Sequence, residues 1–382
     1  MSDMNYKARV NAFVDAVEGR PTEHIPVYLM MDGLYAVHAT GGNIKKATYN
    51  PQIVIDSTRE LVSRVYCDGL GNIFTKGAIF YKRMRSNNFI PSEVGFLQHP
   101  ETYTLSNEEL TELAEDPFKT IAEKVFLRSM GEIYKPFPQN MYSLMIANIG
   151  NTAYLIGLIS NKFALSAELG VPMVYTNLTK APLDYLGSSV RGLANIFTDI
   201  RRTLDRVIAA CDALCPLLEA AGELNFRAPD RNFPFIFFPT LIPHFLNVKQ
   251  FERVYYPTFK RMLDNLADKG FKFVIQFEGN WERFYDIIRS LPENKILGVF
   301  EMGSPALVKE KLGDMMCLSG LYPVSLLGCG EKGKCLDKAK EIVDVMAPGG
   351  RYVFATDKQL INARDARIEN IQAVHAFVHD YQ

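Results

Sequence analysis

Residues 271–303 read FKFVIQFEGNWERFYDIIRSLPENKILGVFEMG, and this stretch has the pattern of a strand, a helix and a second strand. A run rich in β-branched and aromatic residues ends at Glu278, and a second run ends at Glu301. Runs of this composition are typical of buried strands. Residues 281–290 between them have a helical pattern, so the two strands are expected to be parallel and joined by a helical crossover.

The same alternation continues on both sides of this stretch. Further strands are predicted around Cys317 in DMMCLSG and in RYVFAT, which ends at Thr356. Helices are predicted at 251–267, 305–312 and 334–346. Alternating strands and helices indicate an α/β fold with a parallel sheet. Because no GxGxxG loop follows an early strand, a (β/α)₈ TIM barrel is favoured over a doubly wound sheet.

The chain is expected to form one domain spanning 1–382. An α/β barrel is the common architecture that uses 382 residues as a single unit. No Pro/Gly/Ser linker divides the sequence, so we expect one barrel with an N-terminal extension and an elaborated region around 80–150. Within that region, Ser106 and Glu109 have capping-box spacing and predict a helix over 107–115.

Charge and composition exclude several classes of partner. Lys plus Arg number 42 against 43 Asp plus Glu, so no overall positive field attracts nucleic acid or an anionic membrane. The N-terminus, MSDMNYKARV, lacks a signal-peptide pattern, and no run approaches about 18 apolar residues. The six cysteines form no disulfide framework or CxxC pair. We therefore expect a cytoplasmic protein with reduced thiols and a small-molecule substrate.

Three residues that can bind a metal follow or lie within neighbouring predicted strands. Glu278, Glu301 and Cys317 come from three successive strands, whose ends meet at one edge of a barrel. Two carboxylates and a thiolate can hold Zn²⁺ and leave a fourth position open. The alternative from the residues alone is that each Glu pairs with Lys or Arg and that Cys317 is a small buried apolar residue.

Two long segments resemble the uroporphyrinogen-decarboxylase superfamily. FLNVKQFERVYYPTFKRMLDNLADKGFKFVIQFEGNW, at 245–281, is similar to its helix, strand and active-site turn, and GGRYVFATDKQLINARDARIENIQAV, at 349–374, is similar to its final strand and helix. The resemblance spans nearly the whole chain and implies a (β/α)₈ barrel. The arginine-bearing motif of the porphyrinogen decarboxylases is missing from 27–41, so that activity is not expected.

Within the superfamily, the chain most resembles the corrinoid-dependent O-demethylase methyltransferases. The segments that carry this likeness are FEGNW at 277–281, VFEMG at 299–303 and MMCLSG at 315–320. The resemblance implies that Glu278, Glu301 and Cys317 are zinc ligands. The zinc methyltransferases that act on thiols have a His-x-Cys motif where this chain has Gln276-Phe277-Glu278.

The resemblance implies a zinc-dependent enzyme that cleaves a methyl ether, expected to be aromatic. No DxHxxG motif is present, so the Co(I) corrinoid that receives the methyl group would belong to a separate partner protein. Asp32, Tyr35 and His244 are candidate substrate-binding residues. The alternatives are a decarboxylase of the superfamily and a non-catalytic ligand-binding barrel.

Several properties stay open at this point. The sequence does not distinguish an ether from an amine or a thioether as methyl donor, and it does not say whether the chain forms a homodimer. Cys329 and Cys335 lie in GCGEKGKC, where relatives have a different turn, so a local role for them is also open.

Overall fold

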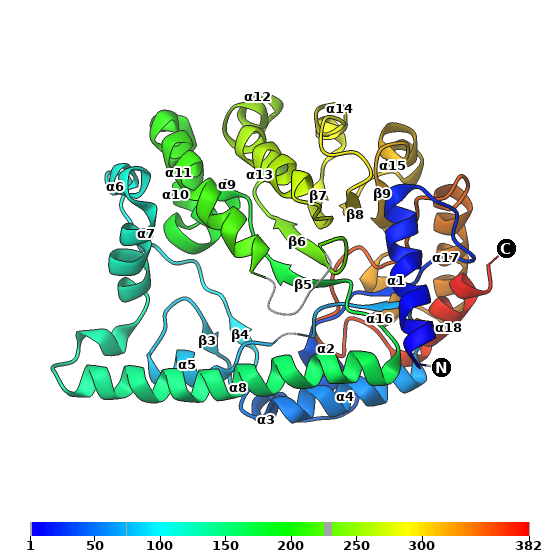
Figure 1. The fold of residues 1–382 in the computed structure, drawn as a ribbon, viewed down its shortest axis with the longest axis horizontal. Coiled ribbons are helices and arrows are strands. Elements are labelled where there is room, and N and C mark those ends of the chain that lie inside the picture. Colours follow the sequence, from blue (N-terminus) through cyan, green and yellow to red (C-terminus); the bar gives the residue numbers. More distant parts are fainter. Residues whose placement is uncertain (1, 74, 225–230, 382) are drawn as a thin grey trace.

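A sheet of five parallel strands forms the centre of the structure (Figure 1). The computed structural model describes residues 2–73, 75–224 and 231–381. The order of the strands in the sheet follows the chain. They are β5 (Tyr175–Leu178), β6 (Phe235–Thr240), β7 (Phe273–Asn280), β8 (Ile296–Met302) and β9 (Cys317–Gly320). Because all five strands are parallel, their carboxyl ends lie at the same end of the sheet, as the sequence predicts.

Parallel pairing continues beyond both edges of this sheet. β1 (Tyr28–Leu29) pairs with β2 (Gly69–Leu70). Single parallel bridges extend the pairing, among them Leu70 with Met173, Val27 with Phe354, and Leu318 with Tyr352. These contacts link the segment before β5 to β2, β1 to the segment around 354, and that segment to β9. The architecture is α/β with parallel strands.

Helices connect the strands and cover the sheet. The structure has α1 (Ser2–Glu18), α2 (Gly33–Ala39), α3 (Ile44–Ala47), α4 (Pro51–Arg64), α5 (Ala78–Arg83), α6 (Leu110–Glu115), α7 (Pro117–Thr120), α8 (Gln139–Leu169), α9 (Pro182–Tyr185), α10 (Leu193–Arg202), α11 (Leu204–Glu223), α12 (Val248–Gln250), α13 (Tyr256–Asp268), α14 (Tyr285–Ile288), α15 (Pro305–Leu312), α16 (Val324–Cys329), α17 (Lys332–Met346) and α18 (Ile368–His379).

The predicted helices coincide with observed ones, with shifts at their ends. The predicted helix 305–312 is α15, and 334–346 lies within α17. The helix expected at 281–290 is only the short α14, preceded by a single turn. The two hydrogen bonds of the predicted capping box are present: the Ser106 N–H donates to Glu109 at 2.8 Å, and the Glu109 N–H donates to the Ser106 hydroxyl at 3.3 Å. The helix predicted at 107–115 begins only at Leu110, as α6.

The region around 80–150 stands apart from the strand–helix alternation. It contains the antiparallel pair β3 (Ile90–Pro91) and β4 (Leu97–Gln98), the short helices α6 and α7, and the first turns of α8. Figure 1 shows α8 running along the lower side of the molecule, with α3 and α4 beneath it. Its amino-terminal part extends toward α5, against which it packs.

The inward-facing side chains of the strands form a separate apolar cluster with α1. Phe13 and Val17 of α1 pack in one cluster with Val274, Leu297 and Cys317. Leu297 and Cys317 lie at the beginnings of β8 and β9. The cluster therefore fills the amino ends of the strands, and the polar groups described next lie at the opposite ends.

Candidate active site

Glu278 and Glu301 meet at the carboxyl ends of β7 and β8. The last paired residues before them are Phe277 and Phe300, which lie opposite each other in the parallel register. The Gly279 N–H donates to Glu301 Oε2 at 2.8 Å, so the Glu301 carboxylate lies against the turn that carries Glu278. The structure brings these two residues together as the sequence predicts.

The two carboxyl groups have different surroundings. Glu301 accepts from the Lys358 ammonium at 3.0 Å; burial opposes ionisation, but the Gly279 N–H and Lys358 lower its pKa. Burial, followed by the charges of Asp184 and Glu301, raises the pKa of Glu278 to about 7. Among the described residues, no side chain or main-chain N–H donates a hydrogen bond to the Glu278 carboxylate. Glu278 can therefore be protonated near neutral pH and donate that proton.

Cys317 does not join this pair. It begins β9 and lies opposite Leu297, four residues before Glu301. At about 3.3 Å per residue, that separation is about 13 Å along the strand. The side chain is 0% exposed in the apolar cluster with α1, and burial raises the pKa of the thiol.

The three expected zinc ligands are thus not assembled. Across the described ranges there is no group of three or more His, Cys, Asp and Glu residues that could hold a metal ion. The sequence contains a signal for this arrangement, because in DMMCLSGLYP the apolar run continues past Cys317 to Tyr322. The strand end in this segment is therefore near Leu321, and Cys317 lies at its start.

His244 lies beside the glutamate pair, on the turn after β6. A Cβ built on Gly279 would lie 2.6 Å from His244 Cγ, so the imidazole is packed directly over Gly279. Burial lowers the pKa of His244, while the nearby Glu301 charge opposes this. Its Nδ1 is buried and has no hydrogen-bond partner within the described part of the chain. A neutral imidazole at this position can bind a polar substrate atom.

Sequence reasoning missed Lys180 and Asp184, which follow β5. The Asp184 carboxylate accepts from the main-chain N–H groups of Leu241 and Ile242 at 3.0 and 2.7 Å, and from the Tyr255 hydroxyl at 2.7 Å. It therefore fixes the turn that presents His244. Burial raises the pKa of Asp184 to about 6.

Lys180 is a cation within electrostatic reach of both Asp184 and Glu278. Burial lowers its pKa, and the carboxylates of Asp184 and Glu278 oppose that shift. Its ammonium donates to the Ser188 hydroxyl at 2.8 Å. The only sequence signal for this residue is its position just after a strand, which is a weak indication of function.

A cavity of about 400 Å³ opens at the ends of β1, β2 and β5, and its lining does not include Glu278, Glu301 or His244. Tyr175 and Phe237 form one wall, with their rings stacked at 4.5 Å. Asp32 and Lys76 line it as well, and the Lys76 ammonium lies 3.9 Å from the centre of the Phe89 ring. Burial raises the pKa of Asp32 to about 6 and lowers that of Lys76 to about 8. The cavity offers flat apolar walls and one pair of charged groups.

The other two substrate candidates differ in their relation to this cavity. Asp32 lines it, and its carboxylate also accepts from the Leu34 N–H at 2.7 Å at the start of α2. Tyr35 points elsewhere: it is 0% exposed, and its hydroxyl donates to the Ala366 carbonyl at 3.1 Å. Tyr35 is therefore a packing residue in this structure.

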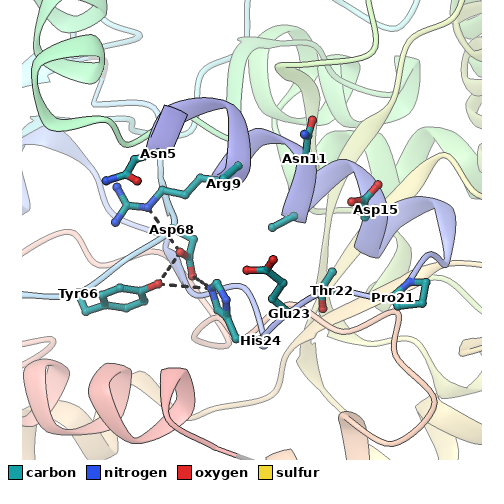
Figure 2. A pocket seen from close by; sticks show the side chains of 12 residues that line it. Asn5, Arg9, Asn11, Asp15, Pro21, Thr22, Glu23, His24, Tyr66 and Asp68 are labelled. Atoms are coloured by element: carbon teal, nitrogen blue, oxygen red, sulfur yellow. Dashed lines mark hydrogen bonds and ion pairs between the residues drawn. The ribbon is translucent and has the colours of Figure 1, made fainter. Parts of the chain in front are cut away.

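Figure 2 shows a second cavity, of about 530 Å³, beside α1. Its polar side chains converge on Asp68, which accepts from Tyr66 at 2.6 Å and lies 3.1 Å from His24 Nε2 and 3.6 Å from Arg9. Asp68 also accepts from the Val27 N–H. These groups fix the chain at the amino ends of β1 and β2, whereas ligands of parallel α/β sheets bind at the carboxyl ends.

Comparison with known proteins gives a likeness of fold. No family model matches the sequence, and no curated protein matches it. A solved structure, a methyltransferase from Methanosarcina mazei, aligns with a TM-score of 0.62 and 15% sequence identity, covering 98% of each chain. At this identity the likeness concerns architecture, and the α/β fold of this chain is similar to that of the methyltransferase over nearly the full length.

Proposed function

We propose that this chain is a methyltransferase that takes a methyl group from a small aromatic methyl ether and transfers it to the Co(I) corrinoid of a partner protein. The carrying observation is a partly buried Glu278 carboxyl that has a raised pKa and no hydrogen-bond donor among the described residues, at the same end of the sheet as an aromatic-walled cavity. The similar fold of the methyltransferase from Methanosarcina mazei supports methyl transfer as the class of reaction.

The proposal includes a closed (β/α)₈ barrel of the uroporphyrinogen-decarboxylase type. The parallel bridges of Val27 with Phe354 and of Leu70 with Met173 support closure, because they relate both edges of the central sheet to β1 and β2. In such a barrel, side chains at the carboxyl ends of all strands converge on one mouth. Asp32, which follows β1 and lines the cavity, fits this arrangement.

The residues of this chain can carry out acid catalysis on the ether. The substrate ring fits between the apolar walls that include Tyr175 and Phe237. As the bond between methyl carbon and oxygen breaks, its electron pair stays on the oxygen, and protonated Glu278 donates its proton there. The phenol leaves with that proton, and Glu278 remains as a carboxylate. A Co(I) corrinoid held by the partner would supply the electron pair for the new bond to the methyl carbon.

Zinc held by Glu278, Glu301 and Cys317 does not fit this arrangement. Cys317 is buried near the amino ends of the strands, and Glu301 is occupied by the Gly279 N–H and Lys358. No step of the proposed reaction therefore uses zinc. The cytoplasmic location and the corrinoid partner remain parts of the proposal.

A second candidate function is decarboxylation of an aromatic acid. Lys76 lines the cavity, Lys180 lies within reach of the Glu278 charge, and loss of hydration lowers the pKa of both. Two ammonium groups beside an apolar cavity can hold substrate carboxylates. This reaction needs no corrinoid, and a test can separate the two functions.

The test incubates the purified protein with methoxylated aromatic compounds and reduced cobalamin, and follows methylcobalamin by absorbance. We expect methyl transfer by the wild type and at least a 100-fold loss in Glu278→Gln, while Glu310→Gln on the exposed face of α15 serves as the control. Carbon dioxide released from aromatic acids without cobalamin would favour the decarboxylase. Elemental analysis of wild type beside Glu278→Ala tests zinc: about one zinc per chain, lost in the variant, would restore the metal assignment.

A further inference from the structure

Helix α8 has two apolar faces, and only one of them is covered by the domain. At about 100° per residue, its buried residues Ala147, Tyr154, Leu158 and Leu165 fall on one side, where α4 and α5 pack against the helix. An amphipathic surface helix has polar residues on its opposite side. The opposite side of α8 is apolar as well.

The exposed apolar residues form a stripe on the amino-terminal half of α8, interrupted by the exposed Thr152. We call Phe137, Met141, Tyr142, Met145, Ile149 and Ile156 the α8 stripe; they are 80%, 53%, 56%, 52%, 61% and 61% exposed. The five on the helix fall within about 100° of arc, and Phe137 lies just before the first turn. An exposed apolar patch of this kind marks an interaction surface.

The charge pattern of α8 argues against a charged partner. Its 31 residues include only two charged side chains, Lys162 and Glu168. Lys162 is buried, and Glu168 forms an ion pair with Arg59. Helices that lie on membrane surfaces have Lys and Arg along their polar face. By length and composition α8 could also cross a membrane, but its other face is packed against α4 and α5 within the domain.

The size of the stripe matches what a stable dimer needs. Its six side chains expose about 800 Å² of surface, given roughly 150–250 Å² for each large side chain, and a standard interface buries about 800 Å² on each partner. The Arg83 guanidinium lies 5.6 Å from the centre of the Tyr142 ring, near the amino-terminal end of the stripe. The stripe side chains themselves are uncharged, and an apolar surface is complementary to itself, which is the requirement for a two-fold contact between identical surfaces.

We propose that the chain forms a homodimer in which the α8 stripes of two copies pack antiparallel about a two-fold axis. The stripe covers about 22 Å of helix from Met141 to Ile156, and its centre lies between Met145 and Ile149. The axis passes near this centre, so the same residue of both copies lies close to it. This inference does not depend on the proposed reaction.

Sedimentation velocity and light scattering test the assembly directly. We expect wild type at about 10 µM, a concentration typical of specific association, to have twice the chain mass of 43.1 kDa. Ile149→Glu places a charge in the apolar contact and should weaken association at least 100-fold. Ala164→Glu, exposed on the same helix beyond the stripe, should remain dimeric. Unchanged circular dichroism and melting temperature show that both variants are folded.

Cross-linking tests the position of the axis. Of the six cysteines, all within the described residues, only Cys329 is exposed, so the experiment uses Cys329→Ser as background. In that background we expect Ile149→Cys to form a covalent dimer with a short bismaleimide and Ala164→Cys to form none. A wild type that is monomeric at 100 µM would overturn the proposal. So would a dimer that survives Ile149→Glu, or a monomer that sediments with neutral phosphatidylcholine vesicles.

Discussion

Glu278 and Glu301 are chemically identical side chains that the structure treats in opposite ways. Glu301 is held by the Gly279 N–H and the Lys358 ammonium, both of which favour the carboxylate. Glu278 is partly buried, and its loss of hydration and the charges of Asp184 and Glu301 disfavour its ionised form. In enzymes, two titratable groups whose surroundings separate their pKa values in this way commonly act as the acid and the base. The acid role proposed here belongs to Glu278 for this reason.

The raised pKa of Glu278 makes a prediction about stability and pH. Its folded pKa of about 7 lies above the ordinary value of 4.5, so its contribution to stability is present below pH 4.5 and is lost as pH rises through 7. Glu278→Gln removes the titrating group. Its free energy of unfolding should exceed that of wild type by up to about 3 kcal/mol at pH 8 and differ little at pH 4.5.

Urea denaturation at both pH values measures this difference. Glu310→Gln on the exposed face of α15 is the matched control and should change the stability little at either pH. Equal stabilities of wild type and Glu278→Gln at pH 8 would mean that the carboxylate is not penalised in the folded protein.

Cys317 gives a second prediction for a single residue. Its thiol is enclosed by apolar side chains near the beginning of β9. Cys317→Ala should therefore leave metal content and activity unchanged and lower the free energy of unfolding by about 1 kcal/mol, through the small cavity that it leaves. Elemental analysis and urea denaturation measure both quantities. Loss of a bound metal in this variant would contradict the placement of Cys317.

The loops after β6 and β7 form one unit at the edge of the sheet. Asp184 holds the main chain at Leu241 and Ile242, and this fixes the turn that leads to His244. His244 then packs on Gly279, whose φ of 71° lies in the left-handed region that favours glycine. The loop that carries Glu278 thus packs against His244, and each loop helps to position the side chain of the other.

Gly279→Ala should disturb this unit. The added Cβ would lie 2.6 Å from His244 Cγ, near the root of that side chain, and the backbone conformation is unfavourable for alanine. We expect a loss of about 1–3 kcal/mol in the free energy of unfolding and at least a tenfold loss of methyl transfer.

Gly333→Ala is the control for this substitution. Gly333 lies in α17, and a Cβ there meets no atom within 4 Å. Alanine should be neutral or stabilise the protein by up to about 1 kcal/mol, because it favours the helix. Equal denaturation curves for the two glycine variants would contradict the packing argument at Gly279.

Across the whole molecule, the carboxyl and amino ends of the parallel strands carry different groups. The carboxyl ends carry Glu278, Glu301 and the cavity with Asp32, whereas the amino ends are filled by α1. Phe13 of α1 is 0% exposed and meets the Tyr28 ring edge-on at 6.3 Å. The N-terminal helix is therefore part of the core of the fold.

Phe13→Ala should lower the free energy of unfolding by about 3–5 kcal/mol, the usual cost of removing a buried ring. Phe118→Ala, which removes the same ring at a 71% exposed position, should change it by less than about 0.5 kcal/mol. Urea denaturation of both variants makes the comparison. Similar losses in both would mean that α1 does not pack as described.

The sequence pattern predicted correctly the features that are determined by residues close together in the chain. The helix at 305–312, the Ser106–Glu109 capping box and the adjacency of Glu278 and Glu301 were all predicted, because periodicity and strand ends are local properties. Lys180 and Asp184 were missed, since their importance comes from residues more than fifty positions away in the chain. Tyr35 was a candidate for substrate binding, but its hydroxyl donates a hydrogen bond to the Ala366 carbonyl.

The sequence by itself determined the α/β architecture, the parallel strands and the strand ends at which Glu278 and Glu301 lie. These follow from the alternation of apolar runs and helical periods within short segments. The tertiary structure alone decided that Cys317 is buried at the other end of β9, that Asp184 fixes the turn before His244 and that α8 has an uncovered apolar face. The reason is that register, burial and electrostatic neighbours depend on contacts between distant segments, which no local pattern contains.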